Sequence, residues 1–72
     1  MIEVRLFATL RENRGKVLYF SPQHRKTYEL LKELEIGEND IAILLINGVH
    51  STFDSEIKDG DILSIFPPIG GG

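Results

Sequence analysis

The sequence predicts an α+β fold in which one helix packs across a mixed sheet of four to five strands. Three observations lead to this prediction. Residues 1–8 alternate apolar and polar side chains, which is the period of a strand with one buried face. The segment between Thr27 and Gly37 has apolar residues at helical spacing. β-Rich segments stand on both sides of this single helical segment. The 72 residues allow one domain at most.

The two N-terminal strands are expected to form an antiparallel hairpin. Residues 1–8 make the first strand, and the alternation places Phe7 on the face opposite the core. Residues 10–15 form a polar connection that ends at Gly15. Residues 16–21 are rich in side chains that favour strands and make the second one. The core-facing side chains of the first strand are Ile2, Val4 and Leu6.

A polar connection, residues 22–26, leads from the hairpin to the helix. Thr27 is the expected N-cap, and Glu29 places a negative charge in the first turn, where the helix dipole favours it. Gly37 is the expected C-terminal stop. A helix of about two and a half turns does not persist alone, so packing on the sheet must hold it. Its apolar stripe consists of Leu30, Leu31 and Leu34.

The segment after the helix reads as a second hairpin. Residues 42–46 are almost all apolar, which predicts a strand covered on both faces or close to it. Asn47 and Gly48 predict a type I′ turn that returns the chain into a short strand at residues 49–50. Phe53 is expected to anchor the irregular segment that follows onto the core.

The last predicted strand, residues 62–66, is entered through a turn at residues 59–61. A ferredoxin-like fold needs two helices, and this chain has sequence for only one. A single helix across a mixed sheet, with the first and last strands adjacent and parallel, is the β-grasp or ubiquitin-like arrangement. We therefore expect a β-grasp domain over residues 1–66 and a flexible glycine-rich tail over residues 67–72.

The tail is the strongest functional signal in the chain. Pro67 and Pro68 fix φ and keep the backbone extended as it leaves the last strand. The glycines at positions 70–72 carry no Cβ, so the backbone fits a slot that a side chain would block. Extended, the six residues after Phe66 span on the order of 20 Å, which brings the carboxylate of Gly72 within reach of a partner's active site. The alternative is a disordered terminus without function. The residues that a partner would grip are Phe66, Pro67, Pro68, Ile69, Gly70 and Gly71.

Phe7 is a second candidate binding residue. An aromatic side chain on the outer face of a strand exposes apolar area unless something covers it, and aromatic residues are favoured anchors at protein interfaces. One interpretation is therefore a docking contact. The other is that the ring shields the sheet's own surface beside the stem of a long Arg or Lys side chain.

Composition excludes several classes of function. A net charge of −3 and a pI near 5.2 argue against a surface that binds nucleic acid. The absence of cysteine excludes disulfides, a thiolate nucleophile and thiolate metal sites. The longest apolar run, residues 41–46, is far shorter than the roughly twenty residues of a membrane span. We therefore expect a cytoplasmic protein with no membrane or nucleic-acid partner.

Nothing in the sequence has the pattern of a catalytic or metal site. His24 and His50 fall in predicted surface turns without a metal-ligand spacing. Asp59 and Asp61 flank Gly60, where aspartate is favoured because it hydrogen-bonds to the turn backbone. No glycine-rich phosphate loop precedes a helix. The sequence predicts a protein that is not an enzyme and binds no metal or cofactor of its own.

Five segments of the chain resemble one known family. They are residues 4–12 (VRLFATLRE), 27–31 (TYELL), 46–48 (ING), 57–61 (IKDGD) and 66–72 (FPPIGGG). The chain resembles the small subunit of molybdopterin synthase and, more broadly, the ubiquitin-like sulfur carriers that include the carrier of thiazole synthesis. The phenylalanine–proline–proline run before the terminal glycines is closer to the molybdopterin branch.

The resemblance implies carrier chemistry at Gly72. An enzyme related to ubiquitin-activating enzymes would adenylate the terminal carboxylate with ATP and magnesium, and a sulfur donor would convert the adenylate to a thiocarboxylate. In the molybdopterin branch the tail enters the large subunit of molybdopterin synthase and gives sulfur to a pterin precursor of the molybdenum or tungsten cofactor.

Three alternatives stay open at this point. Relatives also serve thiazole (thiamine) synthesis and other sulfur-transfer routes. Others are protein modifiers joined to lysines by an isopeptide bond. The third alternative is an interaction domain whose glycine tail is incidental.

Overall fold

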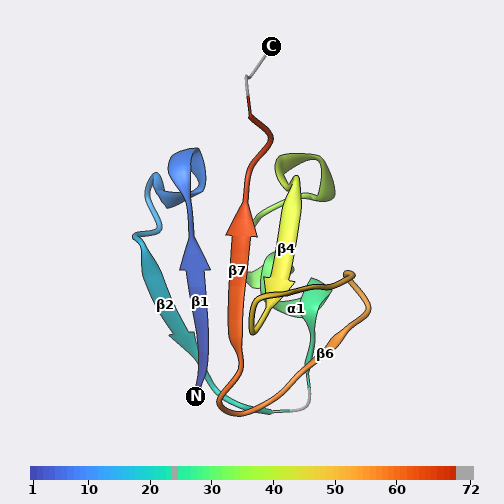
Figure 1. Ribbon diagram of the computed structural model, residues 1–72. Helices are drawn as coiled ribbons and strands as arrows, with labels where there is room; N and C mark the ends of the chain where they lie inside the picture. The colour runs from blue at the N-terminus through green and yellow to red at the C-terminus, as the bar shows by residue number, and fades with distance from the viewer. Residues whose placement is uncertain (24, 70–72) are drawn as a thin grey trace.

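A five-stranded mixed sheet with one helix against it forms the molecule (Figure 1). The computed structural model describes residues 1–23 and 25–69. In chain order the elements are β1 (Ile2–Leu6), the 3-10 helix η1 (Ala8–Arg11), β2 (Val17–Phe20), β3 (Arg25–Lys26), α1 (Thr27–Glu33), the 3-10 helix η2 (Glu38–Asp40), β4 (Ile43–Ile46), β5 (Val49–His50), β6 (Glu56–Ile57) and β7 (Ile62–Phe66). The predictions for His24, Gly70, Gly71 and Gly72 concern positions outside the described residues.

The first and last strands of the domain lie side by side in the middle of the sheet. The strand order is β2-β1-β7-β4-β5, and the central pair β1 and β7 is parallel, with Leu6 opposite Ile65. The pairs β1–β2, β4–β7 and β4–β5 are antiparallel. The expected β-grasp arrangement, with four to five strands, one helix and adjacent parallel first and last strands, is confirmed.

The core lies between the sheet and α1. Every second residue of β1 and β7 points into it, as the alternation in the sequence predicted for β1, and α1 contributes its apolar face. The side chains at the centre are inaccessible to solvent, so each stabilises the fold by roughly 1.5–3 kcal/mol relative to an exposed position. They include Ile2, Val4, Leu6, Leu30, Leu63 and Ile65.

The helix begins differently from the prediction. Lys26, and not Thr27, is the N-cap residue. Thr27 is already helical and fully buried, and its hydroxyl donates a hydrogen bond of 2.9 Å to the backbone oxygen of Ser55. The side chain is needed to satisfy a neighbouring loop, so it cannot cap the helix. Glu29 has the expected first-turn role, because its carboxylate accepts a hydrogen bond of 2.6 Å from the Lys26 N–H.

The expected stop at Gly37 is wrong. The helix ends at Glu33, and the chain turns at Glu35, which has a φ of +59°. Gly37 has a φ of −85°, so it makes no use of the left-handed region that favours glycine. Gly37 is instead the N-cap residue of η2, and its N–H donates a hydrogen bond of 3.0 Å to the carboxylate of Asp40, the last residue of η2.

Three other features escaped the sequence analysis. Ile43 in β4 is 37% exposed and Leu45 is half-buried, so the outer face of this strand is only partly covered. Leu10 belongs to η1 and is buried, although its segment reads as a polar connection. The short strands β3 and β6 pair antiparallel and form a second, two-stranded sheet.

Both predicted turns are present. Asn47 and Gly48 have φ values of +52° and +81°, the two positive values that a type I′ turn requires, and Ile46 pairs with Val49 across it. At the other turn Gly60 has a φ of +89°. Phe53 packs against the core, as expected for an anchor of its irregular segment.

Replacing Ile65 with alanine should lower the free energy of unfolding by about 2–5 kcal/mol, because Ile65 is fully buried in the central strand and the change leaves a cavity. Chemical denaturation measures the effect. The matched control is Ile69→Ala, since Ile69 is 97% exposed and its loss should change stability by less than about 0.5 kcal/mol. Equal effects at the two positions would contradict the assignment of the core.

Candidate functional site at the C-terminal tail

The root of the tail is held by the sheet. β7 ends at Phe66, whose backbone oxygen accepts a hydrogen bond of 2.8 Å from the N–H of Ala42 beside β4. Beyond it the chain emerges quickly: Pro67 is half-buried, Pro68 is exposed, and Ile69 is 97% exposed. Figure 1 shows the tail continuing past the tip of β7, at the opposite end of the molecule from the N-terminus. The described part of the tail therefore leads away from the domain.

Phe7 lies directly against this root. Its ring stacks on the ring of Phe66, with 4.1 Å between the centroids and 11° between the planes. The guanidinium of Arg11 lies over the Phe7 ring, with its Cζ 5.4 Å from the centroid. Phe7 is on the outer side of the sheet, as predicted, and it is covered by two neighbours from its own chain. Arg11 supplies the long stem that the shielding interpretation required.

A shallow groove runs beside the two prolines. It has a volume of about 490 Å³ and lies between the tail, η1 and η2. Its lining consists of Thr9, Leu10, Arg14, Asn39, Asp40, Pro67 and Pro68. The groove gives a partner room to approach the tail root from the side.

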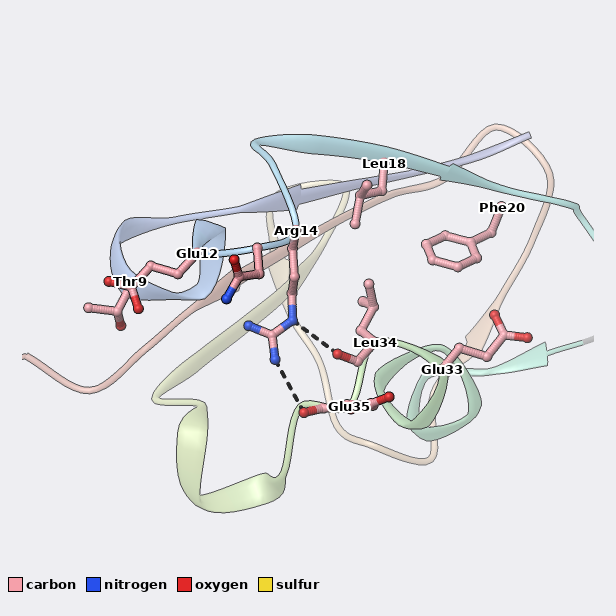
Figure 2. Close-up of a pocket in the computed structure, with 9 residues that line it drawn as sticks. Thr9, Glu12, Arg14, Leu18, Phe20, Glu33, Leu34 and Glu35 are labelled. Carbon is pink, nitrogen blue, oxygen red and sulfur yellow. Dashed lines mark hydrogen bonds between the residues drawn. The ribbon is translucent and has the colours of Figure 1, made fainter.

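A larger groove, of about 660 Å³, lies between β2 and the end of α1 and has Arg14 in its middle (Figure 2). Arg14 has a structural task there. Its guanidinium donates hydrogen bonds to the backbone oxygens of Leu34 (3.0 Å), Leu10 (3.2 Å) and Glu35 (3.3 Å). The hydrogen bonds to Leu34 and Glu35 satisfy carbonyl groups at the C-terminus of α1, where the helix dipole also favours a positive charge. This groove does not have the arrangement of a catalytic site.

Several titratable side chains form ion pairs at the surface or hydrogen bonds within turns. Arg25 donates a hydrogen bond of 2.8 Å to the Glu33 carboxylate, which raises the pKa of Arg25 above its usual value. Asp59 pairs with the N-terminal amino group. Asp61 accepts hydrogen bonds from the side chain of Asn47 (2.9 Å) and the N–H of Lys58 (2.8 Å), which confirms its role in the turn.

Within residues 1–23 and 25–69, no group of three or more His, Cys, Asp or Glu side chains is placed to hold a metal ion. The helices of that same part of the chain are also too short and polar to cross a membrane.

The structure thus brings Phe7, Phe66, Pro67, Pro68 and Ile69 together at one end of the molecule. Gly70, Gly71 and Gly72 lie outside the described residues. The sequence analysis missed Arg11 as part of this site. Its spacing of four residues from Phe7 is the available signal, but that spacing brings two side chains together only if the chain turns, and the segment reads as a strand end followed by a loop.

The chain matches the model of one known protein family. A family model described as the ThiS family matches residues 4–72. We find no match among curated protein sequences.

Several solved structures have the same fold. A protein described as a molybdopterin converting factor, subunit 1, from Pyrococcus furiosus is 26% identical, with a TM-score of 0.70 over 94% of this chain and 97% of that one. Small archaeal modifier protein 1 of Haloferax volcanii is 22% identical, with a TM-score of 0.76 over 94% and 97% of the two chains. Subunit 1 in the complex of subunits 1 and 2 of the molybdopterin-converting factor from Helicobacter pylori is 23% identical, with a TM-score of 0.67 over 99% and 97%.

The contact between Phe7 and Phe66 should be measurable as a coupling in stability. In a double-mutant cycle of Phe7→Leu and Phe66→Leu, we expect a coupling free energy of about 0.5–1.5 kcal/mol, because stacked rings stabilise beyond the area that they bury. Chemical denaturation of the four proteins gives this value. A cycle of Phe7→Leu with Tyr19→Leu, an exposed ring on the edge strand β2, is the control and should show no coupling. Additive effects at Phe7 and Phe66 would contradict the stack.

Proposed function

The chain belongs to the ThiS family of ubiquitin-like sulfur carriers, and on that premise we propose that Gly72 is the site where it carries sulfur, as a thiocarboxylate. The observation that supports this most directly is the change along the tail. Phe66 is fixed in the sheet and stacked on Phe7, whereas Ile69, three residues later, is 97% exposed. The tail thus becomes exposed within three residues of the sheet, and the domain does not cover Ile69.

The chemistry takes place in two steps. In the first, an oxygen of the Gly72 carboxylate attacks the α-phosphorus of ATP, which forms an acyl adenylate and releases pyrophosphate. In the second, a sulfur donor attacks the acyl carbon and AMP leaves with the bonding electrons. Activation is necessary because a carboxylate is a poor electrophile. Any acid, base and metal ion that these steps require belong to the activating enzyme, so this chain acts as a carrier and not as an enzyme.

We place the destination of the sulfur in molybdopterin synthesis, for the molybdenum or tungsten cofactor. Two structural relatives are described as subunit 1 of a molybdopterin converting factor, and one of them was solved in complex with subunit 2. The corresponding partners of this chain are an adenylyltransferase related to ubiquitin-activating enzymes and a large synthase subunit. Phe66, Pro67, Pro68, Ile69, Gly70 and Gly71 form the segment that these partners grip, and Phe7 stacks on the first of these residues.

A second candidate function uses the same adenylate. If the amino group of a lysine attacks the acyl carbon in place of sulfur, the product is an isopeptide bond and the chain is a protein modifier. The terminal glycines suit both reactions, because both need an unhindered acyl group. The structural relative named as a modifier shares the fold with this chain.

Incubation with ATP, a homologous activating enzyme and sulfide should increase the intact mass of the protein by about 16 Da, because one oxygen of the Gly72 carboxylate is replaced by sulfur. Mass spectrometry of the whole chain detects the change, and fragmentation assigns it to the C-terminus. A reaction without ATP is the control. If the mass is unchanged but isopeptide-linked conjugates form in cell extract, the chain is a modifier and the carrier proposal is wrong.

Deletion of Gly72, or replacement of Gly71 by phenylalanine, should abolish adenylation without lowering the free energy of unfolding. The first change withdraws the carboxylate from the reacting phosphate, and the second adds a side chain where the partner admits only backbone. ATP–pyrophosphate exchange measures adenylation, and thermal denaturation reports the fold. Full exchange activity with either variant would refute the role of the terminal glycines.

A further inference from the structure

We infer that Phe7 and Arg11 are positioning residues that fix the direction in which the tail leaves the sheet. This inference rests on the proposed function for its consequence, which is the rate of adenylation. Its structural part concerns the isolated protein alone. This role differs from docking, because Phe7 acts through its contacts with Phe66 and Arg11 of the same chain and not through contact with a partner.

The first step is that Phe66 is the last residue held by strand pairing. β7 ends there, and the next two residues are prolines, which have no N–H to donate to a neighbouring strand. The orientation of Phe66 therefore determines the starting direction of everything that follows. Its backbone oxygen is fixed on one side by the N–H of Ala42. On the other side its ring is fixed by Phe7, at 4.1 Å and nearly parallel.

The second step is that Phe7 is itself held in place. Phe66 stacks on its ring, and the guanidinium of Arg11 also lies over the ring, with Cζ 5.4 Å from the centroid. Arg11 is in turn tied to the backbone, because its Nε donates a hydrogen bond of 2.8 Å to the oxygen of Leu6, the last residue of β1. Phe66, Phe7 and Arg11 thus form a cluster in which both of the other side chains contact the Phe7 ring, and we call this cluster the root stack.

The third step explains why a turn follows β1 at once. Ala8 has a φ of +53°, an uncommon value for a residue with a Cβ. This turn starts η1 and brings Arg11 back over Phe7 instead of letting the chain continue along the strand. A strand that simply continued would carry Arg11 away from the tail. The backbone at Ala8 is therefore what assembles the root stack.

A rotation of the backbone at Phe66 displaces the residues that follow it, and the displacement grows with distance along the tail. The three residues from Phe66 to Ile69 span about 10 Å when extended, so a rotation of about 15° at Phe66 moves Ile69 by roughly 2.5 Å. Displacements of about 1 Å at a reacting group can already reduce rates a hundredfold. A loosened root stack should therefore lower the rate of adenylation even when the partner is saturated with carrier.

The decisive variant is Phe7→Leu, which keeps an apolar side chain but removes the flat ring. With the cognate activating enzyme and ATP, we expect the single-turnover adenylation rate at saturating carrier to fall at least about fivefold, with Kd for the enzyme within about twofold of wild type. Arg11→Met, which keeps the stem but not the planar group, should act in the same direction. Phe7→Tyr preserves the ring and should restore the rate. Tyr19→Ala removes an aromatic side chain from β2, away from the tail, and serves as the control.

A docking role gives the opposite pattern. If Phe7→Leu raises Kd and leaves the saturated rate at the wild-type value, Phe7 is a partner contact and the positioning role is wrong. An unchanged Kd together with an unchanged saturated rate also overturns it.

A second measurement needs no enzyme. The ¹⁵N heteronuclear NOE of the Ile69 amide reports nanosecond motion three residues beyond Phe66. It should be lower in Phe7→Leu than in wild type, and restored in Phe7→Tyr. Failure of wild-type adenylation would refute the proposed function, while this NOE would still decide whether Phe7 orders the tail. An NOE that is the same in Phe7→Leu and wild type would overturn the inference.

Discussion

The parallel pairing of β1 with β7 is the contact on which the rest of this small domain depends. Parallel strands cannot be joined by a tight turn, so the chain must cross over between them, and α1 together with the second hairpin occupies that crossover. The apolar sides of both strands then face the helix and make the centre of the core. In a chain of 72 residues, where a single core is close to the lower limit for stability, few other contacts could compensate for the loss of this pair.

The same pairing determines where the C-terminal tail leaves the sheet. Because β7 is in the middle of the sheet, it pairs with β1 up to Ile65 and with β4 up to its last residue, Phe66. The tail therefore starts beside β4 and one residue beyond the paired end of β1. Since β1 and β7 run in the same direction, their ends coincide, and Phe7 meets Phe66. An antiparallel pair would have brought the start of β1 to this point.

The sequence was a good guide wherever one local rule decided the structure. Alternation located β1, and the two turns followed from their glycine, asparagine and aspartate residues. It failed where a distant contact overrode a local preference. Thr27 is a good capping residue in isolation, but its hydroxyl is required by Ser55, 28 residues further on. Leu10 looked like a loop residue because only the turn at Ala8 brings it into the core. Arg11 was missed for the same reason.

The absence of cysteine is easier to understand from the geometry of the tail. A carrier that used a side chain would have to bring a thiol on a Cβ into its partner's active site, and the slot would need to fit that side chain. A carrier that uses its terminal carboxylate needs only backbone at the point of entry, so the slot can be narrow enough to exclude other chain ends. Its cargo is then recognised together with the segment that precedes it. Under the proposed function, the specificity of transfer depends on the direction of the tail as well as on its sequence, and the tail starts at Phe66, which is held by Ala42 and Phe7.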